Sequence, residues 1–184
     1  MHDMKSHSIT GYEMTREQRF VEAVIKKCQE DKGTSARLKR ADNPALEYQS
    51  WDLLGSFGIN LEKEYERLPY VTVAASIAKS KANKNGTLRL GQAIARCYGD
   101  GNRDNQAKAR LRRLLACTDL PEVCRILRPI LTLIDSRVGQ PIDFERLLKQ
   151  LRHFHFDSGA RVKAQWAQEF YGNIPTETNE EQAV

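Results

Sequence analysis

The sequence has 184 residues, of which 40% are hydrophobic and 29% are charged, and its mean hydropathy is -0.60. These values are typical of a globular protein, and they exclude a fibre, a membrane protein and a disordered chain. Lysine and arginine number 29 against 24 acidic residues, so the formal charge is +5 and a polyanion such as nucleic acid becomes a candidate partner.

Apolar residues recur at helical spacing along almost the whole chain, which predicts an all-α fold. A capping box that begins at Thr15 predicts the start of a first helix, and Gly33 is expected to end it. Asn43 and Pro44 are residue types that favour an N-cap and a first helical position, so another helix is expected from there to Gly55.

Prolines, tryptophans and a polar segment mark the rest of the chain. Pro69 is expected to interrupt or kink its helix, and Pro129 to kink a later one. Trp51 and Trp166 lie at helical spacing among Leu and Phe, which favours core anchors over base-stacking platforms. The asparagines, glycine and lysines of residues 80–87 predict a mobile basic loop.

These features divide the chain into two small helical lobes. The expected parts are a disordered N-terminal extension (1–14), an N-terminal lobe (15–79), the mobile basic loop (80–87), a C-terminal lobe (88–172) and a disordered acidic tail (173–184). Asp157 or Ser158 is expected to cap the last helix of the second lobe. No signal sequence and no apolar run of membrane-spanning length is present, so we expect a cytoplasmic protein with no membrane partner.

Residues that carry chemistry are scattered. The four cysteines are Cys28, Cys97, Cys117 and Cys124. Because they include no CxxC pair, buried reduced thiols are expected rather than a disulfide framework. His153 and His155 are two residues apart and so fall on different faces of a helix, which argues against a zinc site. The usual nucleotide-binding and hydrolase motifs are also missing, and we expect no enzyme, no cofactor and no metal.

Positive charge is concentrated in two segments. Residues 79–113 hold ten lysines and arginines against two aspartates, and residues 32–40 form a second basic cluster. Arginine suits phosphate because its planar guanidinium donates two hydrogen bonds to one phosphate and keeps its charge. The clusters therefore predict contacts to a nucleic-acid backbone without sequence preference. Solvated helix faces remain the alternative for either cluster taken alone.

Several sequence blocks, taken in order, resemble one family. They are 33–40 (GTSARLKR), 90–95 (LGQAIA), 110–115 (RLRRLL) with 120–123 (LPEV) and 127–128 (LR), 142–144 (IDF) and 161–171 (RVKAQWAQEFY). The family is the CasB-type small subunit of the type I-E CRISPR Cascade surveillance complex. Pro129 departs from the family pattern, because the family helix usually runs on at that position.

The resemblance implies an all-helical, two-lobed protein without catalytic activity that self-associates head to tail as a dimer beside the other Cascade subunits. It further implies a basic surface groove that supports the guide RNA and the target DNA strand and holds the displaced non-target strand of the R-loop. The residues that it brings forward as contacts are Arg37, Lys39, Arg40, Arg96, Arg110, Arg112, Arg113, Arg125, Arg128, Arg161 and Lys163. The basic loop and its start add Lys79, Lys81 and Lys84.

Two other functions remain open on the sequence. A stand-alone helical regulator of DNA or RNA would place a helix in the major groove and bind with sequence preference. A structural adaptor would use its basic faces against acidic proteins, and removing the charge would then leave nucleic-acid affinity unaltered.

Overall fold

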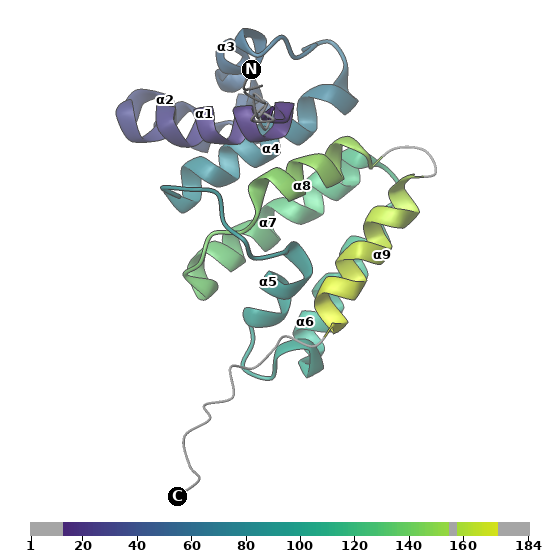
Figure 1. The fold of residues 1–184 in the computed structure, drawn as a ribbon. Coiled ribbons are helices and arrows are strands. Elements are labelled where there is room, and N and C mark those ends of the chain that lie inside the picture. The colour runs from purple at the N-terminus through teal and green to yellow at the C-terminus, as the bar shows by residue number, and fades with distance from the viewer. Residues whose placement is uncertain (1–12, 155–157, 173–184) are drawn as a thin grey trace, which may run out of the picture.

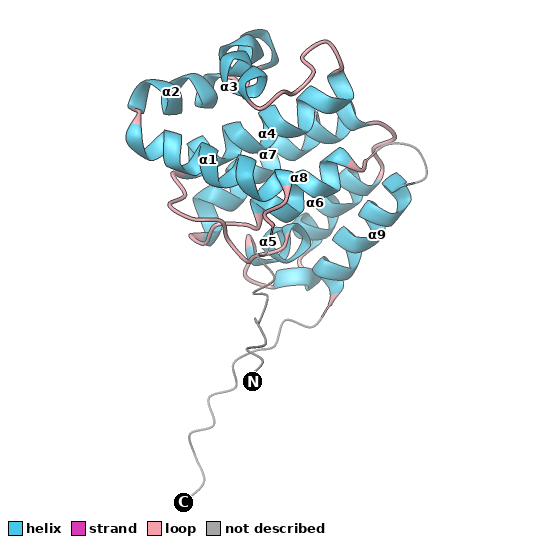
Figure 2. Ribbon diagram, turned by 45° about the horizontal axis from the view of Figure 1, so that its top comes forward, coloured by secondary structure: helices cyan, strands magenta, loops and turns pink. Residues whose placement is uncertain are grey.

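The computed structural model describes residues 13–154 and 158–172. These residues form helices and contain no strand, which confirms the predicted all-α fold (Figure 2). The acidic tail, most of the N-terminal extension and the predicted cap Asp157 lie outside the described residues. The elements in chain order are α1 (Arg16–Glu30), α2 (Lys32–Arg40), the 3₁₀ helix η1 (Pro44–Ser50), α3 (Trp51–Ser56), α4 (Glu64–Ser80), α5 (Leu90–Arg96), the 3₁₀ helix η2 (Gly101–Arg103), α6 (Asn105–Leu115), α7 (Leu120–Val138), α8 (Phe144–Arg152) and α9 (Ser158–Tyr171).

The first helix begins where the capping box predicts. Thr15 Oγ1 accepts a hydrogen bond from the Gln18 N–H at 3.2 Å, and Gln18 Oε1 accepts from the Thr15 N–H at 2.9 Å. The prediction that Gly33 ends this helix is wrong, because α1 stops before Asp31 and Gly33 lies inside α2. The Asp31 carboxylate instead caps α2 by accepting from the N–H groups of Gly33 and Thr34 at 2.8 and 3.1 Å.

The segment after α2 differs in part from the predicted helix. Asn43 Oδ1 accepts from the Ala45 N–H at 3.0 Å, which confirms the predicted N-cap. The helix that follows is the 3₁₀ helix η1, which continues into the short α3. Trp51 stands at their junction with 41% of its surface exposed, so its prediction as a core anchor is wrong. Leu53 and Leu54 point into the core from α3 instead.

The central helix is α4, which contacts α1, α2, α7 and α8. Its residues from Leu68 to Ala75 are all buried, because neighbours cover the helix on several sides rather than along one stripe. Pro69 lies inside α4 and does not interrupt it, and Pro129 lies inside α7 in the same way. A proline within a helix removes one backbone hydrogen bond, and here the surrounding packing keeps both helices continuous.

The loop between α4 and α5 is fastened to the connection between α7 and α8. Gly86 donates its N–H to the Ile142 carbonyl at 3.0 Å, and a Cβ at Gly86 would lie 1.8 Å from the Pro141 carbonyl oxygen. Asn85 Nδ2 donates to Asp143 Oδ1 at 3.1 Å, and its Oδ1 accepts from the Phe144 N–H at 2.8 Å. These contacts hold residues 85 and 86 against the connection between α7 and α8. Position 86 must be glycine for this close approach, because a Cβ there would overlap the Pro141 carbonyl.

The molecule is elongated, with α1–α3 at one end and α5 and α6 at the other (Figure 1). One hydrophobic cluster runs through the described residues, from Phe20 on α1 to Phe170 on α9. Because α4 packs against both α7 and α8, this cluster continues across the expected boundary between the lobes. The division into two lobes and the mobility of the 80–87 loop stay predictions.

The packing of α5 against α9 organises the C-terminal end. A Cβ at Gly91 would lie 2.3 Å from the Trp166 carbonyl oxygen, so the two helices meet at van der Waals distance only because this residue is glycine. Trp166 is fully buried, as predicted, and its Nε1 donates to Gln150 Oε1 at 2.9 Å. Glu169 accepts from the Gly91 N–H and from Arg146, which ties α5, α8 and α9 together.

Candidate nucleic-acid interface

Helix packing brings three of the predicted arginines to a single cavity between α6 and α7, called here the α6–α7 cavity. Arg110 and Arg113 on α6 and Arg125 on α7 line this space of about 280 Å³, and no carboxylate is among its lining residues. The cause is local, because Leu111 and Leu114 are buried and so direct the flanking arginines outward from the core.

The arginines of the α6–α7 cavity differ in how firmly they are held. The Arg110 Nε donates to the Tyr98 hydroxyl, which positions that guanidinium beside the cavity. Arg125 has 63% of its side chain exposed and lies 3.8 Å from Glu122, a separation at which an exposed ion pair contributes little. Arg113 and the neighbouring Arg112 are both exposed at the surface.

A second group of predicted nucleic-acid contacts pairs with an aspartate. Asp42 accepts a hydrogen bond from Lys79 Nζ, and its other oxygen lies 3.8 Å from Arg128 Nε. With Lys39, these residues line a cavity of about 280 Å³ that also contains Asp135. The two carboxylates offset much of the positive charge, and Lys79 and Arg128 here join the segment between α2 and η1 to α4 and α7. Their contact with nucleic acid stays a prediction.

Lysines and an arginine of α2 and of the loop after α4 lie nearer the surface, and Lys39 of the preceding cavity is among them. Lys39, Lys81 and the additional Lys32 line a shallow cavity of about 490 Å³ between α1, α2 and the end of α4. Lys81 ends α4 in the left-handed conformation with a φ of 53°, which turns the chain into the loop. Arg40 and Lys84 are exposed.

The other predicted residues are separate from these cavities and have protein partners. Arg37 forms an ion pair with Asp52 at 3.2 Å, and the Arg96 guanidinium donates to Gln140 Oε1 at 2.9 Å. Lys163 Nζ lies 5.7 Å from the centre of the Phe154 ring, within the range of a cation–π interaction.

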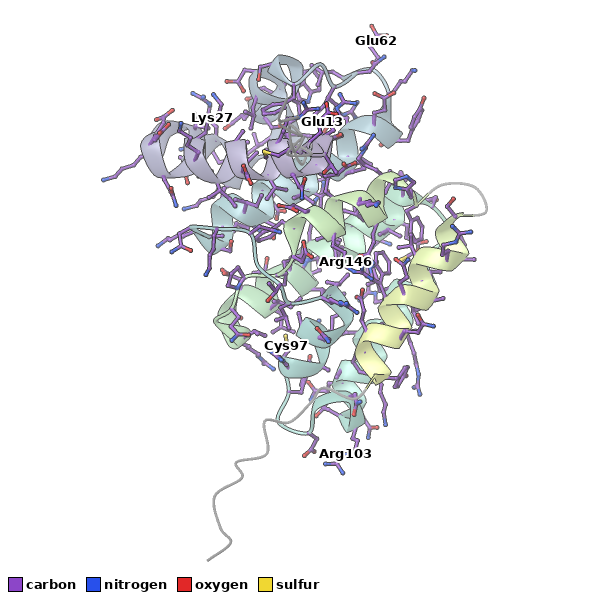
Figure 3. The ribbon with its side chains drawn as sticks, viewed as in Figure 1. Glu13, Lys27, Glu62, Cys97, Arg103 and Arg146 are labelled. Carbon is purple, nitrogen blue, oxygen red and sulfur yellow. The ribbon has the colours of Figure 1, made fainter. Side chains whose placement is uncertain are left out.

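Another basic cavity, between α8 and α9, contains residues that the sequence does not single out. This cavity, the α6–α7 cavity and the lysine-lined cavity beside α2 are called here the three basic cavities. Arg146 and Lys149 on α8 and His153, which follows the end of α8, line it together with the predicted Arg161 on α9, around about 310 Å³. Figure 3 labels Arg146 near the middle of the molecule. The missed signal was the spacing i, i+3 and i+7 on α8, which places the three basic residues on one face, apart from the buried leucines.

The cysteines do not add a reactive site. Cys28, Cys97, Cys117 and Cys124 are all free, and all but the half-buried Cys28 are buried. Burial raises the pKa of the Cys124 thiol to about 11, so it stays protonated at neutral pH. No group of three or more His, Cys, Asp and Glu residues in the described part of the chain is arranged to hold a metal ion.

Comparison with known proteins identifies the family of the chain. A family model described as CRISPR-associated protein Cse2 matches residues 34–171, which is well over half of the chain. The chain belongs to the Cse2 family. The matched region of this Cse2 protein extends from α2 to the end of α9, so all three basic cavities draw on it.

Solved CasB structures have the same fold as this Cse2 chain. CasB from Thermobifida fusca is 22% identical with a TM-score of 0.65, and the match covers 86% of this chain and 99% of that one. CasB from Thermus thermophilus is 24% identical with a TM-score of 0.66, covering 87% and 100%. CasB from M. ruber is 24% identical with a TM-score of 0.66, covering 86% and 94%. A search of curated proteins finds no match.

Membrane insertion receives no support from the helices. Among those that the structure describes, none has both the length and the apolar character needed to cross a bilayer.

Proposed function

We propose that this Cse2 protein is the non-catalytic small subunit of a cytoplasmic type I-E Cascade ribonucleoprotein. In this role it contacts the other Cascade subunits and a second copy of itself. Its basic cavities bind the backbones of the guide RNA and the target DNA strand, and they hold the displaced non-target strand of the R-loop. Family membership supports the association with a CRISPR system, and the basic cavities support the contacts to nucleic acid.

The observation that carries this proposal is the α6–α7 cavity, where Arg110, Arg113 and Arg125 converge with no carboxylate in the lining. Three guanidinium groups around one concave surface suit phosphate groups of a nucleic-acid strand. Such contacts carry no sequence information, as a subunit that must accept every target requires. Because R-loop formation is a nearly balanced exchange of duplexes, a few backbone contacts can shift it towards the open state.

The test is target binding by the assembled complex with Arg113→Ala and Arg125→Ala combined. We expect weaker binding of a matched target, and a salt slope reduced by about 0.7 for each phosphate of a single strand that the variant no longer neutralises. Arg110 is left in place because its bond to Tyr98 also supports the fold.

The matched control removes two positive charges elsewhere, by Lys26→Ala and Lys27→Ala on α1. Lys26 has 73% of its side chain exposed and lies outside all three basic cavities. Gel shifts over a range of salt concentrations provide the measurement. If the paired arginine variant and the control both bind like the wild type, the α6–α7 cavity does not contact nucleic acid.

A further inference from the structure

Exposed aromatic side chains stand at the α3 end of the molecule and at the start of α4, away from the α6–α7 and α8–α9 cavities. Tyr48 is 57% exposed, Trp51 41% and Tyr65 52%. Glu62 projects from the same end, opposite Arg103 at the far end of the molecule (Figure 3). We call Tyr48, Trp51, Glu62 and Glu64 the aromatic–acidic surface.

The Arg67 side chain packs against the indole ring of Trp51. The Arg67 guanidinium lies 5.9 Å from the centre of the ring, and it is fixed by hydrogen bonds to the Glu47 carboxylate and the Leu61 carbonyl. Glu47 is itself buried. Through Arg67, α4 is thus joined to η1, to α3 and to the segment before α4. A large ring that is already ordered loses little conformational entropy when a partner covers it, which is a property of interface anchors.

Tyr48 stands one turn before Trp51 on the same side of the helix. The Trp51 N–H donates to the Tyr48 carbonyl at the end of η1, so the two side chains are three residues apart in 3₁₀ geometry. Tyrosine and tryptophan are the residue types most enriched at the energetic centres of protein interfaces. Their exposure here contrasts with the other tryptophan, Trp166, which is fully buried.

Two exposed carboxylates distinguish this end of the molecule. Residues 43–66 carry five carboxylates, of which Glu47, Asp52 and Glu66 pair with Arg67, Arg37 and Lys63. The other two, Glu62 and Glu64, are exposed just before α4 and at its first residue. A nucleic-acid strand would be repelled by this field, but a protein face rich in lysine and arginine would be attracted.

We propose that the aromatic–acidic surface docks onto a basic face of a neighbouring protein subunit of the ribonucleoprotein. This inference rests on the proposed function and identifies the surface that meets another protein rather than a nucleic acid. Lysine or arginine side chains of the partner lie against the open faces of Tyr48 and Trp51 and pair with Glu62 and Glu64. The three basic cavities remain available to nucleic acid in this arrangement.

The test measures how much of this chain is retained when the complex is purified through a tag on another Cascade subunit. The variants are Tyr48→Ala with Trp51→Ala, and separately Glu62→Lys with Glu64→Lys. The control is Tyr171→Ala, which removes a tyrosine 51% exposed on α9. We expect each pair to reduce retention about tenfold or more, as loss of interface anchors does, with the control unchanged.

Three results would overturn the proposal. The first is full retention of both paired variants. The second is weaker binding of single-stranded nucleic acid by the free chain that carries the aromatic pair, which would make the surface a base-stacking platform. The third is loss of a dimer of the free chain, measured by sedimentation, which would make the occupant a second copy. The charge-reversed pair keeps the test decisive if Trp51→Ala destabilises the fold. If the wild-type chain is not retained with the tagged Cascade subunit, the proposed function itself is wrong, and this result is distinct from a failure of the docking proposal.

Discussion

At the scale of single residues, Glu17 shows how one ion pair joins distant helices. Arg152 on α8 donates a hydrogen bond to the Glu17 carboxylate on α1, and its guanidinium lies 5.6 Å from the Tyr70 ring on α4. Burial acts to raise the pKa of Glu17, but a hydrogen bond from its own backbone and the charge of Arg152 together hold it below its ordinary value. The folded state therefore favours the ionised carboxylate.

This lowered pKa makes stability depend on pH. The ionised Glu17 stabilises the fold above its unfolded pKa of about 4.3, and that contribution is lost as the pH falls through the lower folded pKa. We expect Glu17→Gln to reduce the free energy of unfolding by about 1–2 kcal/mol at neutral pH and by less in acid. Urea unfolding at about pH 6 and about pH 3.5 measures the difference. Glu30→Gln, at an exposed site, is the control, and an equal loss at both pH values would contradict the expectation.

At the scale of elements, the contact of α5 with α9 depends on a missing side chain. Besides the Trp166 carbonyl, a Cβ at Gly91 would meet the Phe170 backbone nitrogen at 2.6 Å and the Glu169 Cβ at 2.7 Å. Two of the three nearest atoms belong to the α9 backbone, so no rotation of a side chain could relieve the contact. Any larger residue must move one helix away from the other.

Gly91→Ala is therefore expected to destabilise the protein by about 1–3 kcal/mol or more, as overpacking of a core does. Gly55→Ala on α3 is the matched control, because no atom lies within 4 Å of the added Cβ. That change should be neutral or stabilise by up to about 1 kcal/mol through helix propensity. Chemical denaturation of both variants gives the comparison, and equal midpoints would show that α5 and α9 do not pack as closely as described.

Local signals in the sequence predict where helices begin better than they predict which residues the neighbouring helices cover. The caps at Thr15 and Asn43 are correct because they depend on neighbouring residues alone. Trp51 is wrongly assigned to the core because helical spacing does not show whether another helix covers that face. Gly33 is wrongly assigned to a helix end because Asp31 supplies the cap. The α8–α9 cavity was missed because it forms only when two helices meet in space.

At the scale of the whole molecule, lysines and arginines line cavities between helix pairs that lie apart from the aromatic–acidic surface. The α6–α7 and α8–α9 cavities both lack carboxylates among their lining residues, and within the second Arg146 is paired with the buried Glu169, which leaves Lys149 and Arg161 as its cations without an ion pair among the described residues. They share no helix, so a strand that contacts both must extend across the C-terminal part of the molecule. The binding free energy of such a strand would be the sum of separate contributions from the two cavities.

This arrangement predicts additive effects on binding to a single strand. We expect Lys149→Ala with Arg161→Ala to weaken binding by the assembled complex and to lower the salt slope. When this pair is combined with Arg113→Ala and Arg125→Ala, the decreases in log affinity should add. Titrations at several salt concentrations measure both quantities, with Lys26→Ala and Lys27→Ala as the control for total charge. Unchanged binding by the α8–α9 pair would restrict the interface to the α6–α7 cavity.

The contrast between the two tryptophans gives the molecule a pair of intrinsic optical reporters. Trp166, sealed in the core near α5 and α9, emits from an apolar environment, while Trp51, 41% exposed at α3, emits from contact with water and is open to collisional quenchers. We therefore expect iodide to quench the fluorescence of Trp51 and not that of Trp166. Burial of the α3 end by a partner shifts the emission of Trp51 alone, whereas unfolding changes both, so one fluorescence spectrum separates assembly from loss of structure.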